Sequence, residues 1–128
     1  MKPRILLLDD EPELRSALRD RLSMEGYDVQ TAPDGRLGLK LYYENPVDLV
    51  ITDVLMPEMD GLEVIRILCG TPSPPLIIAM SGGGSRDLEF LVEATEFGAT
   101  RTLSKPFLLD DLVSLVKDLL SSIPHPSA

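Results

Sequence analysis

The sequence predicts an α/β domain in which a doubly wound, five-stranded parallel sheet is covered by five helices. Three observations lead to this expectation. Short strand patterns alternate five times with stretches of helical periodicity along the chain. The first of the strand patterns, at residues 5–8, is a continuous apolar run, as in a strand that helices cover on both faces. The chain has 128 residues, a length that suits one domain with a substantial core.

The five strands are expected in short segments that lie between the predicted helices and their turn-forming residues. These segments cover residues 5–8, 27–31, 47–52, 76–80 and 100–104. The run at 5–8 contains only aliphatic side chains and lacks the alternation of a half-exposed strand. We therefore expect this strand to be buried on both faces.

Helices are expected between these runs, each with apolar residues at helical spacing that can cover the sheet. The first has Pro12 near its first turn and ends at Gly26, positions that proline and glycine favour in helices. The second is short, begins at a capping Asp34, and carries Leu37 and Leu41.

The third helix has the clearest start signal. Asp60 and Glu63 have the spacing of a capping box, in which each side chain satisfies a backbone N–H group of the first turn. Leu62, Ile65 and Leu68 then provide the buried face of this helix.

The last two helices are expected at about residues 85–97 and at 108–121. Gly98 ends the former, and Asp110 and Asp111 lie at the positive end of the dipole of the latter. The final helix carries a wide apolar stripe, which favours packing into the core, while the alternative interpretation is a homodimer or partner face. The stripe consists of Leu108, Leu109, Leu112, Val113, Leu115, Val116, Leu119 and Leu120.

The chain is acidic, with 12 basic and 21 acidic residues and a formal charge of −9. This charge disfavours direct binding to nucleic acids or to anionic membranes. The one cysteine, Cys69, permits no internal disulfide, and no apolar run approaches the length of a membrane span. We expect a cytoplasmic protein with one domain over residues 1–123 and a flexible tail over 124–128.

Three carboxylates are predicted to meet at one edge of the sheet. In doubly wound sheets ligands bind beyond the carboxyl ends of the strands, and in the flavodoxin-like order 2-1-3-4-5 the switch point lies between the first and third strands. Asp9 and Asp10 follow the first strand, and Asp53 follows the third. Each alone could be an ordinary cap or turn residue. Together they repel one another, and oxygen ligands without His or Cys favour Mg²⁺ over zinc.

A hydroxyl and an ammonium group follow two other strands. Ser81 comes directly after the run at 76–80, and Lys105 comes after the run at 100–104. Beside a metal–carboxylate cluster, Lys105 would neutralise the oxygens of a transferring phosphoryl group and Ser81 would donate a hydrogen bond to it. A carboxylate in such a site can act as the nucleophile and form an acyl phosphate.

Four segments, taken together and in this order, resemble the receiver domains of two-component response regulators. They are Leu-Leu-Leu-Asp-Asp-Glu-Pro at 6–12, Asp-Leu-Val-Ile-Thr-Asp-Val-Leu-Met-Pro at 48–57 with Met-Asp-Gly at 59–61, Met-Ser-Gly at 80–82, and Lys-Pro-Phe at 105–107. The resemblance covers nearly the whole chain. It implies a phosphorylation-dependent signalling switch rather than an enzyme that releases a product.

The resemblance also implies a role for each acid of the predicted site. Asp53 would be the phosphoacceptor. Asp10, Asp53 and the backbone carbonyl of Leu55 would ligate Mg²⁺ directly, and Asp9 would do so through water.

Beyond the acids, the resemblance implies that Ser81 is the switch hydroxyl and that Lys105 binds the phosphoryl group, with a cis peptide bond between Lys105 and Pro106. The donor would be a phosphohistidine of a histidine kinase or phosphotransfer protein. The output would pass to an effector protein or domain that the sequence does not identify. Thr102 stands where the family usually has an aromatic residue, three positions before the lysine.

Three alternatives stay open on the sequence alone. The chain could be a degenerate receiver that binds a partner without phosphorylation, although the complete set of polar residues disfavours this. A metal-dependent phosphatase usually needs a second acid two residues after the nucleophile, where this chain has Leu55. A flavodoxin-like cofactor binder needs a phosphate loop, but the loop after the first strand is acidic and would repel phosphate in the absence of a metal.

Overall fold

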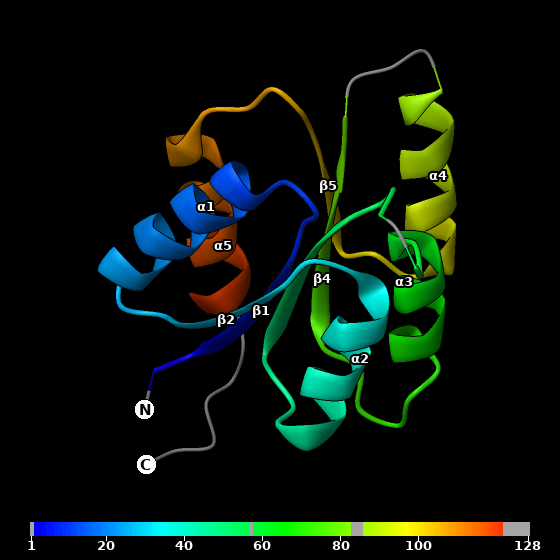
Figure 1. Ribbon diagram of the computed structural model, residues 1–128, viewed down its shortest axis with the longest axis horizontal. Helices are drawn as coiled ribbons and strands as arrows, with labels where there is room; N and C mark the ends of the chain where they lie inside the picture. The colour runs from blue at the N-terminus through cyan, green and yellow to red at the C-terminus, as the bar shows by residue number, and fades with distance from the viewer. Residues whose placement is uncertain (1, 57, 83–85, 122–128) are drawn as a thin grey trace.

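A computed structural model of the protein describes residues 2–56, 58–82 and 86–121, and within them it contains a five-stranded parallel sheet (Figure 1). The strand order is β2-β1-β3-β4-β5, as predicted. The strands are β1 (Arg4–Leu8), β2 (Asp28–Ala32), β3 (Leu49–Asp53), β4 (Leu76–Ser81) and β5 (Arg101–Ser104). Parallel pairing of β1 with β3 and of β3 with β4 brings the carboxyl ends of these three strands side by side.

Helices cover both faces of the sheet. They are α1 (Pro12–Met24), α2 (Gly35–Glu44), α3 (Gly61–Cys69), α4 (Asp87–Phe97) and α5 (Leu109–Ser121). α1 and α5 lie together on one face, and α2, α3 and α4 lie on the other (Figure 1). None of the helices in the described part of the chain combines the length and the apolar character needed to cross a bilayer.

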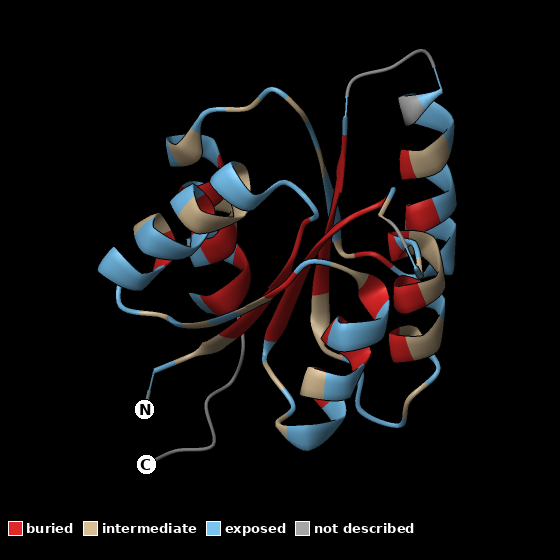
Figure 2. Cartoon of the chain, in the orientation of Figure 1, coloured by how far each residue is buried: buried red, intermediate tan, exposed pale blue. Residues whose placement is uncertain are grey.

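The sheet separates two apolar cores. Successive residues of β1 point to opposite faces, so that Leu6 and Leu8 belong to one core and Ile5 and Leu7 to the other. All four side chains are almost completely buried, as the continuous apolar run predicted. Figure 2 shows buried residues concentrated in the strands and on the sides of the helices that face them. Burial of this apolar surface is the main favourable contribution to folding.

Two strands extend further toward their carboxyl ends than the apolar runs predicted. β3 includes Asp53, which is in register with Met80, and β4 includes Ser81, which is in register with Ser104. Backbone hydrogen bonding continues past the last apolar residue because it does not depend on side-chain polarity. These two site residues are therefore held by the sheet itself rather than by a loop.

The predicted helix caps form, but the capping box is incomplete. Asp34 accepts a hydrogen bond from the backbone N of Leu37 at 2.9 Å, and Asp60 accepts one from the backbone N of Glu63 at 2.9 Å. The carboxylate of Glu63 accepts hydrogen bonds from Arg66 instead of returning to the cap. Ion pairing along the exposed side of α3 thus replaces the reciprocal half of the box.

The buried face of α2 differs from the expected one, because Leu37 is 39% exposed. Gly38, Leu39 and Tyr42 are buried instead. A Cβ atom at Gly38 would lie 2.5 Å from Cδ2 of Leu8, so α2 approaches β1 more closely than a larger residue at this position allows. The side of α2 that faces β1 therefore includes Gly38, and the preceding residue, Leu37, is exposed to solvent.

The apolar stripe of α5 is used mainly in the core, which confirms the core-packing interpretation. The residues of this helix that are buried are Leu112, Val113, Val116, Leu119 and Leu120. Leu108 precedes the helix and is 70% exposed. A homodimer through α5 stays a hypothesis that this packing neither requires nor tests.

Two expectations concern residues outside the described ranges. The fourth helix was expected to begin at about Ser85, and its described part begins at Asp87. The predicted tail at 124–128 also lies outside the described residues. The remaining boundaries differ from the predictions by one or two residues, which is the usual scatter at the ends of elements.

Candidate functional site

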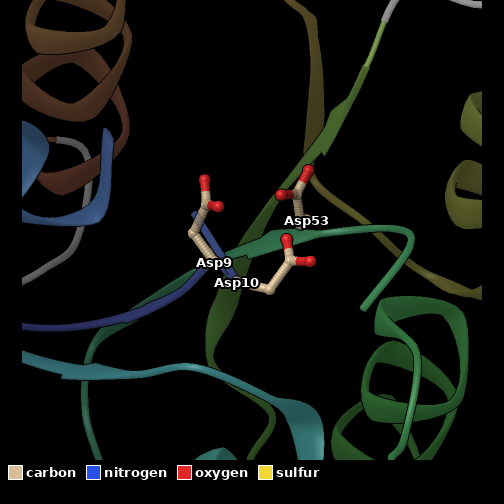
Figure 3. A group of neighbouring side chains, drawn as sticks. All are labelled: Asp9, Asp10 and Asp53. Carbon is tan, nitrogen blue, oxygen red and sulfur yellow. The ribbon is translucent and has the colours of Figure 1, made fainter. Parts of the chain in front are cut away.

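The carboxylates of Asp9, Asp10 and Asp53 meet at the carboxyl ends of β1 and β3, as predicted (Figure 3). One oxygen atom from each lies within 4.8 Å of the others. Asp9 is fully buried, Asp53 is 5% exposed, and Asp10 is open to solvent. Carboxylates this close in a site with little water repel one another strongly unless a cation lies between them.

Hydrogen bonds hold the two buried acids within the end of the sheet. The backbone N of Asp9 donates to the carbonyl of Ala32 at 3.2 Å, and the Asp9 carboxylate accepts a hydrogen bond from the backbone N of Glu11 at 2.8 Å. The Thr52 hydroxyl donates to the carbonyl of Asp53 at 2.9 Å. The Asp9 carboxylate is therefore oriented by the backbone, and the backbone of Asp53 is held by the side chain of its neighbour.

The Lys105 ammonium group reaches this cluster from the segment after β5. Its Nζ donates to Oδ2 of Asp53 at 2.9 Å, to Oε1 of Glu11 at 3.0 Å and to Oδ2 of Asp9 at 3.2 Å. An ammonium group has three N–H donors, so each of them has a carboxylate acceptor. The peptide bond between Lys105 and Pro106 is cis, as predicted.

Ser81 places a buried hydroxyl at the end of β4. Its side chain is 2% exposed, and its Oγ has no hydrogen-bond partner among the described residues. The Ser81 carbonyl accepts a hydrogen bond from the backbone N of Lys105 at 2.8 Å, which ties the hydroxyl and the ammonium group to neighbouring strands. An unpartnered buried polar group is unfavourable, so this hydroxyl is available to an incoming acceptor.

Burial and charge perturb the ionisation of two groups in the site. Burial raises the pKa of Asp53 to about 7, although the hydrogen bond from Lys105 opposes this shift, and the negative charge of Asp9 adds to it. Burial lowers the pKa of Lys105, but hydrogen bonds to Asp53 and Glu11 outweigh it and raise the pKa above its usual value. Lys105 is therefore cationic near neutral pH, and the surroundings of Asp53 favour a further positive charge beside it.

Comparison with known protein families identifies the family of the chain that carries these acids, the ammonium group and the hydroxyl. The response regulator receiver domain family matches residues 5–117. The chain belongs to this family. Membership supports a role in two-component signalling over the phosphatase and the flavodoxin-like cofactor binder.

Individual relatives of this receiver domain agree with the family assignment. The response regulator MprA of Mycolicibacterium vanbaalenii is 39% identical over 120 residues, which cover 94% of this chain and 51% of that protein. A putative response regulator from Chloroflexus aurantiacus superimposes with a TM-score of 0.87 at 30% identity, over 94% of this chain and 99% of its own. The receiver domain of a signal transduction histidine kinase from Syntrophus aciditrophicus superimposes with a TM-score of 0.86 at 32% identity. The match covers 98% of this chain and 96% of that one. The chain spans about half the length of the curated relatives it matches.

The acidic cluster of the receiver domain fits a hard divalent cation such as Mg²⁺. The grouped donors are all carboxylate oxygens, the ligands that Mg²⁺ prefers, and the exposed Asp10 leaves one side open to the waters that this ion retains. The third predicted direct ligand, the backbone carbonyl of Leu55, stays a prediction. Leu55 lies two residues after Asp53, and its side chain is 55% exposed.

The contact between Glu11 and Lys105 was not predicted from the sequence. The two residues are 94 positions apart, and the contact depends on how far two long side chains reach across the end of the sheet. The one sequence signal for it is weak, since Glu11 directly follows the pair Asp9 and Asp10. It gives the ammonium group a third carboxylate acceptor, beside Asp9 and Asp53.

Proposed function

We propose that this receiver domain accepts a phosphoryl group on Asp53 from a phosphohistidine of a histidine kinase or phosphotransfer protein. The observation that carries the proposal is the contact of 2.9 Å between Lys105 Nζ and Asp53 Oδ2. Among the described residues, both carboxylate oxygens of Asp9 accept a hydrogen bond from an N–H group, whereas only Oδ2 of Asp53 does. The other oxygen of Asp53 is therefore available to attack the phosphorus atom of a donor. Asp10 has no such contact with the ammonium group in the described structure.

In the proposed transfer, an oxygen of the Asp53 carboxylate forms a bond to phosphorus while the P–N bond of the phosphohistidine breaks. The electron pair of that bond returns to the imidazole nitrogen. Because the other ring nitrogen of the phosphohistidine carries a proton, the histidine leaves as a neutral ring. Lys105 neutralises charge on the phosphoryl oxygens, and the unpartnered Ser81 hydroxyl donates a hydrogen bond to one of them. The strands hold these groups in place before the donor arrives, which reduces the entropic cost of the reaction.

The proposal assigns Mg²⁺ to the acid cluster, with Asp10, Asp53 and the carbonyl of Leu55 as direct ligands and Asp9 as a ligand through water. When bound, the cation neutralises the carboxylates and the phosphoryl oxygens. Register pairing of Leu8 with Thr52 keeps the ends of β1 and β3 adjacent, which supports a shared site for the acids that follow them.

In this proposal the domain is a cytoplasmic switch and not an enzyme with a separate substrate, because the phosphoryl group is accepted by its own side chain. The altered surface would be recognised by an effector protein or domain. The alternative is a degenerate receiver that binds its partner without phosphorylation. The presence of the whole polar set in one site disfavours it, namely Asp9, Asp10, Asp53, Ser81 and Lys105.

Incubation with acetyl phosphate or phosphoramidate and Mg²⁺, followed by intact-mass measurement, tests the proposal. We expect one phosphoryl group per chain, which hydroxylamine removes because acyl phosphates react with it. Asp53→Asn should take up none. Asp118→Asn, at an exposed acid of α5, is the matched control and should be labelled like the native chain.

Equal labelling of Asp53→Asn and the native chain would exclude Asp53 as the acceptor. If the native chain takes up no phosphoryl group while a functional receiver in the same reaction does, the degenerate-receiver alternative gains support instead.

A further inference from the structure

Glu11 holds one of the three N–H donors of Lys105 although it is not one of the grouped acids. Its Oε1 lies 3.0 Å from Nζ, and its side chain is 62% exposed. The other two acceptors of the ammonium group are buried, since the side chains of Asp9 and Asp53 are 0% and 7% exposed. One of the three N–H groups of Lys105 is therefore hydrogen-bonded to an acid that is exposed at the surface of the site.

Helix capping does not explain this position of Glu11. It is the N-cap residue of α1, a position where shorter polar side chains accept hydrogen bonds from the first turn. The Glu11 side chain makes no such cap hydrogen bond. Its backbone N donates to Asp9, and its carboxylate extends across the site to Lys105. The contact with Lys105 orients the side chain.

We propose that Glu11 is a specificity-determining residue that discriminates among phosphodonors by their charge. The inference rests on the proposed function, in which Asp53 is the acceptor. Because all three N–H donors of Lys105 are used, a phosphoryl oxygen can bind the ammonium group only by replacing one acceptor. Glu11 is the replaceable one, since it is exposed while Asp9 and Asp53 are held at the ends of strands.

Glu11 also repels an anionic donor at short range. Glu11 and Asp53 contact the same Nζ atom, at 3.0 Å and 2.9 Å, so the donor must approach the Asp53 carboxylate close to the Glu11 charge. This repulsion grows with the charge of the donor, and the exposure of Glu11 limits it through solvent screening. A dianionic donor such as acetyl phosphate is therefore hindered more than monoanionic phosphoramidate.

The two small donors provide a balanced comparison. In both reactions an oxygen of Asp53 forms a bond to phosphorus. The P–O bond of acetyl phosphate breaks with its electron pair leaving on acetate, and the P–N bond of phosphoramidate breaks with its protonated nitrogen leaving as ammonia. Because the leaving groups differ, the informative quantity is the change that each substitution causes in the ratio of the two rates.

The experiment measures initial rates of Asp53 phosphorylation by each donor at saturating Mg²⁺, in the native chain, Glu11→Gln and Glu13→Gln. Glu11→Gln removes the charge and keeps the size of the side chain. In Glu11→Gln, the ratio of the acetyl phosphate rate to the phosphoramidate rate should be about three times the native ratio. High salt should reduce this difference between the variant and the native chain. Glu13, an exposed acid in the first turn of α1, is the matched control, and Glu13→Gln should leave the ratio near the native value.

An unchanged ratio in Glu11→Gln would overturn the inference. So would an equal change in Glu13→Gln, because it would assign the effect to the net charge of the chain. Slower reaction of Glu11→Gln with both donors would show that Glu11 positions Lys105 instead of competing for it, which also overturns the inference. Failure of the native chain to be labelled by either donor would contradict the proposed function itself, so the two failures are distinguishable.

Discussion

A Cβ atom at Gly61 would lie 1.9 Å from the carbonyl oxygen of Asp53. The first residue of α3 therefore packs directly on the backbone of the proposed phosphoacceptor. The backbone N of Gly61 also donates to the carbonyl of Val54 at 2.7 Å, which closes the loop between β3 and α3. Glycine leaves the room that this close approach needs.

Gly61→Ala should lower the free energy of unfolding by about 1–3 kcal/mol, because the backbone around Asp53 must move to accept a methyl group. Urea denaturation measures the change. Gly70→Ala, at the other end of α3, is the matched control, since its Cβ would lie 3.4 Å from the nearest atom, the carbonyl oxygen of Ile67. Equal free energies of unfolding for the two variants would contradict the steric argument.

Neutralising Asp53 should stabilise the chain when divalent cations are removed with EDTA. Burial, with the negative charge of Asp9, raises the folded-state pKa of Asp53 from 3.8 to about 7. Between these values the folded state binds more protons than the unfolded state, so the free energy of unfolding falls as the pH rises. Asp53→Asn has no charge at this position and therefore does not lose this free energy of unfolding as the pH rises. The melting temperature of the variant should exceed the native one by several degrees at about pH 8, and by much less at about pH 4.5.

Thermal melts of Asp53→Asn, Asp118→Asn and the native chain across this pH range provide the measurement. The Asp118 variant should follow the native curve, because its side chain is exposed on α5. A melting temperature of Asp53→Asn below the native value at the alkaline end would show that the Asp53 charge stabilises the fold through Lys105, contrary to the prediction.

Mg²⁺ should raise the melting temperature of the native chain. A ligand that binds the folded acid cluster and not the unfolded chain stabilises the fold by mass action. Asp10 contributes the exposed carboxylate of the cluster, and the gain should largely vanish in Asp10→Asn. The comparison requires melts with Mg²⁺ and with EDTA for each variant. A native-sized response in Asp10→Asn would count against Asp10 as a direct ligand.

The strands and the meeting of the acids could be predicted because they follow from local pattern and topology. The aliphatic run of β1 has no polar face, so it had to lie between two layers of helices. Once the strand order was expected, Asp9 and Asp53 had to lie at neighbouring strand ends. Neither inference needs the coordinates of any side chain.

Contacts that depend on side-chain packing could not be predicted in this way. The close approach of Gly38 to Leu8 sets the rotation of α2, and periodicity alone favoured Leu37 on the inner face. The contact between Glu11 and Lys105 joins distant parts of the chain through two flexible side chains. Both are decided by tertiary structure, which overrides local preference.

Thr102 limits the routes by which phosphorylation can change the surface of the domain. It is an exposed residue of β5, in register with Ala79 of β4. In the receiver domains that the sequence resembles, an aromatic residue at this position turns inward when the switch hydroxyl moves. Threonine is too small to fill such a space or to change much surface by rotating. A movement of Ser81 must therefore be transmitted elsewhere.

The start of α4 is the expected route. Gly82 directly follows the buried Ser81, and glycine allows a large backbone change at low steric cost. α4 packs against both β4 and β5, so a change at the end of β4 can shift its first turn. A backbone change is also expected at residues 83–85, which lie outside the described residues.

Amide hydrogen exchange with and without beryllofluoride, a mimic of the phosphoryl group, tests this route in the presence of Mg²⁺. Protection should change at Gly82 and in the first turn of α4, and little in β5. Ser81→Ala should remove the change in α4, because without the hydroxyl nothing draws the end of β4 toward the phosphoryl group. A large change around Thr102 with none at the start of α4 would show that the signal travels through β5 despite the missing aromatic ring.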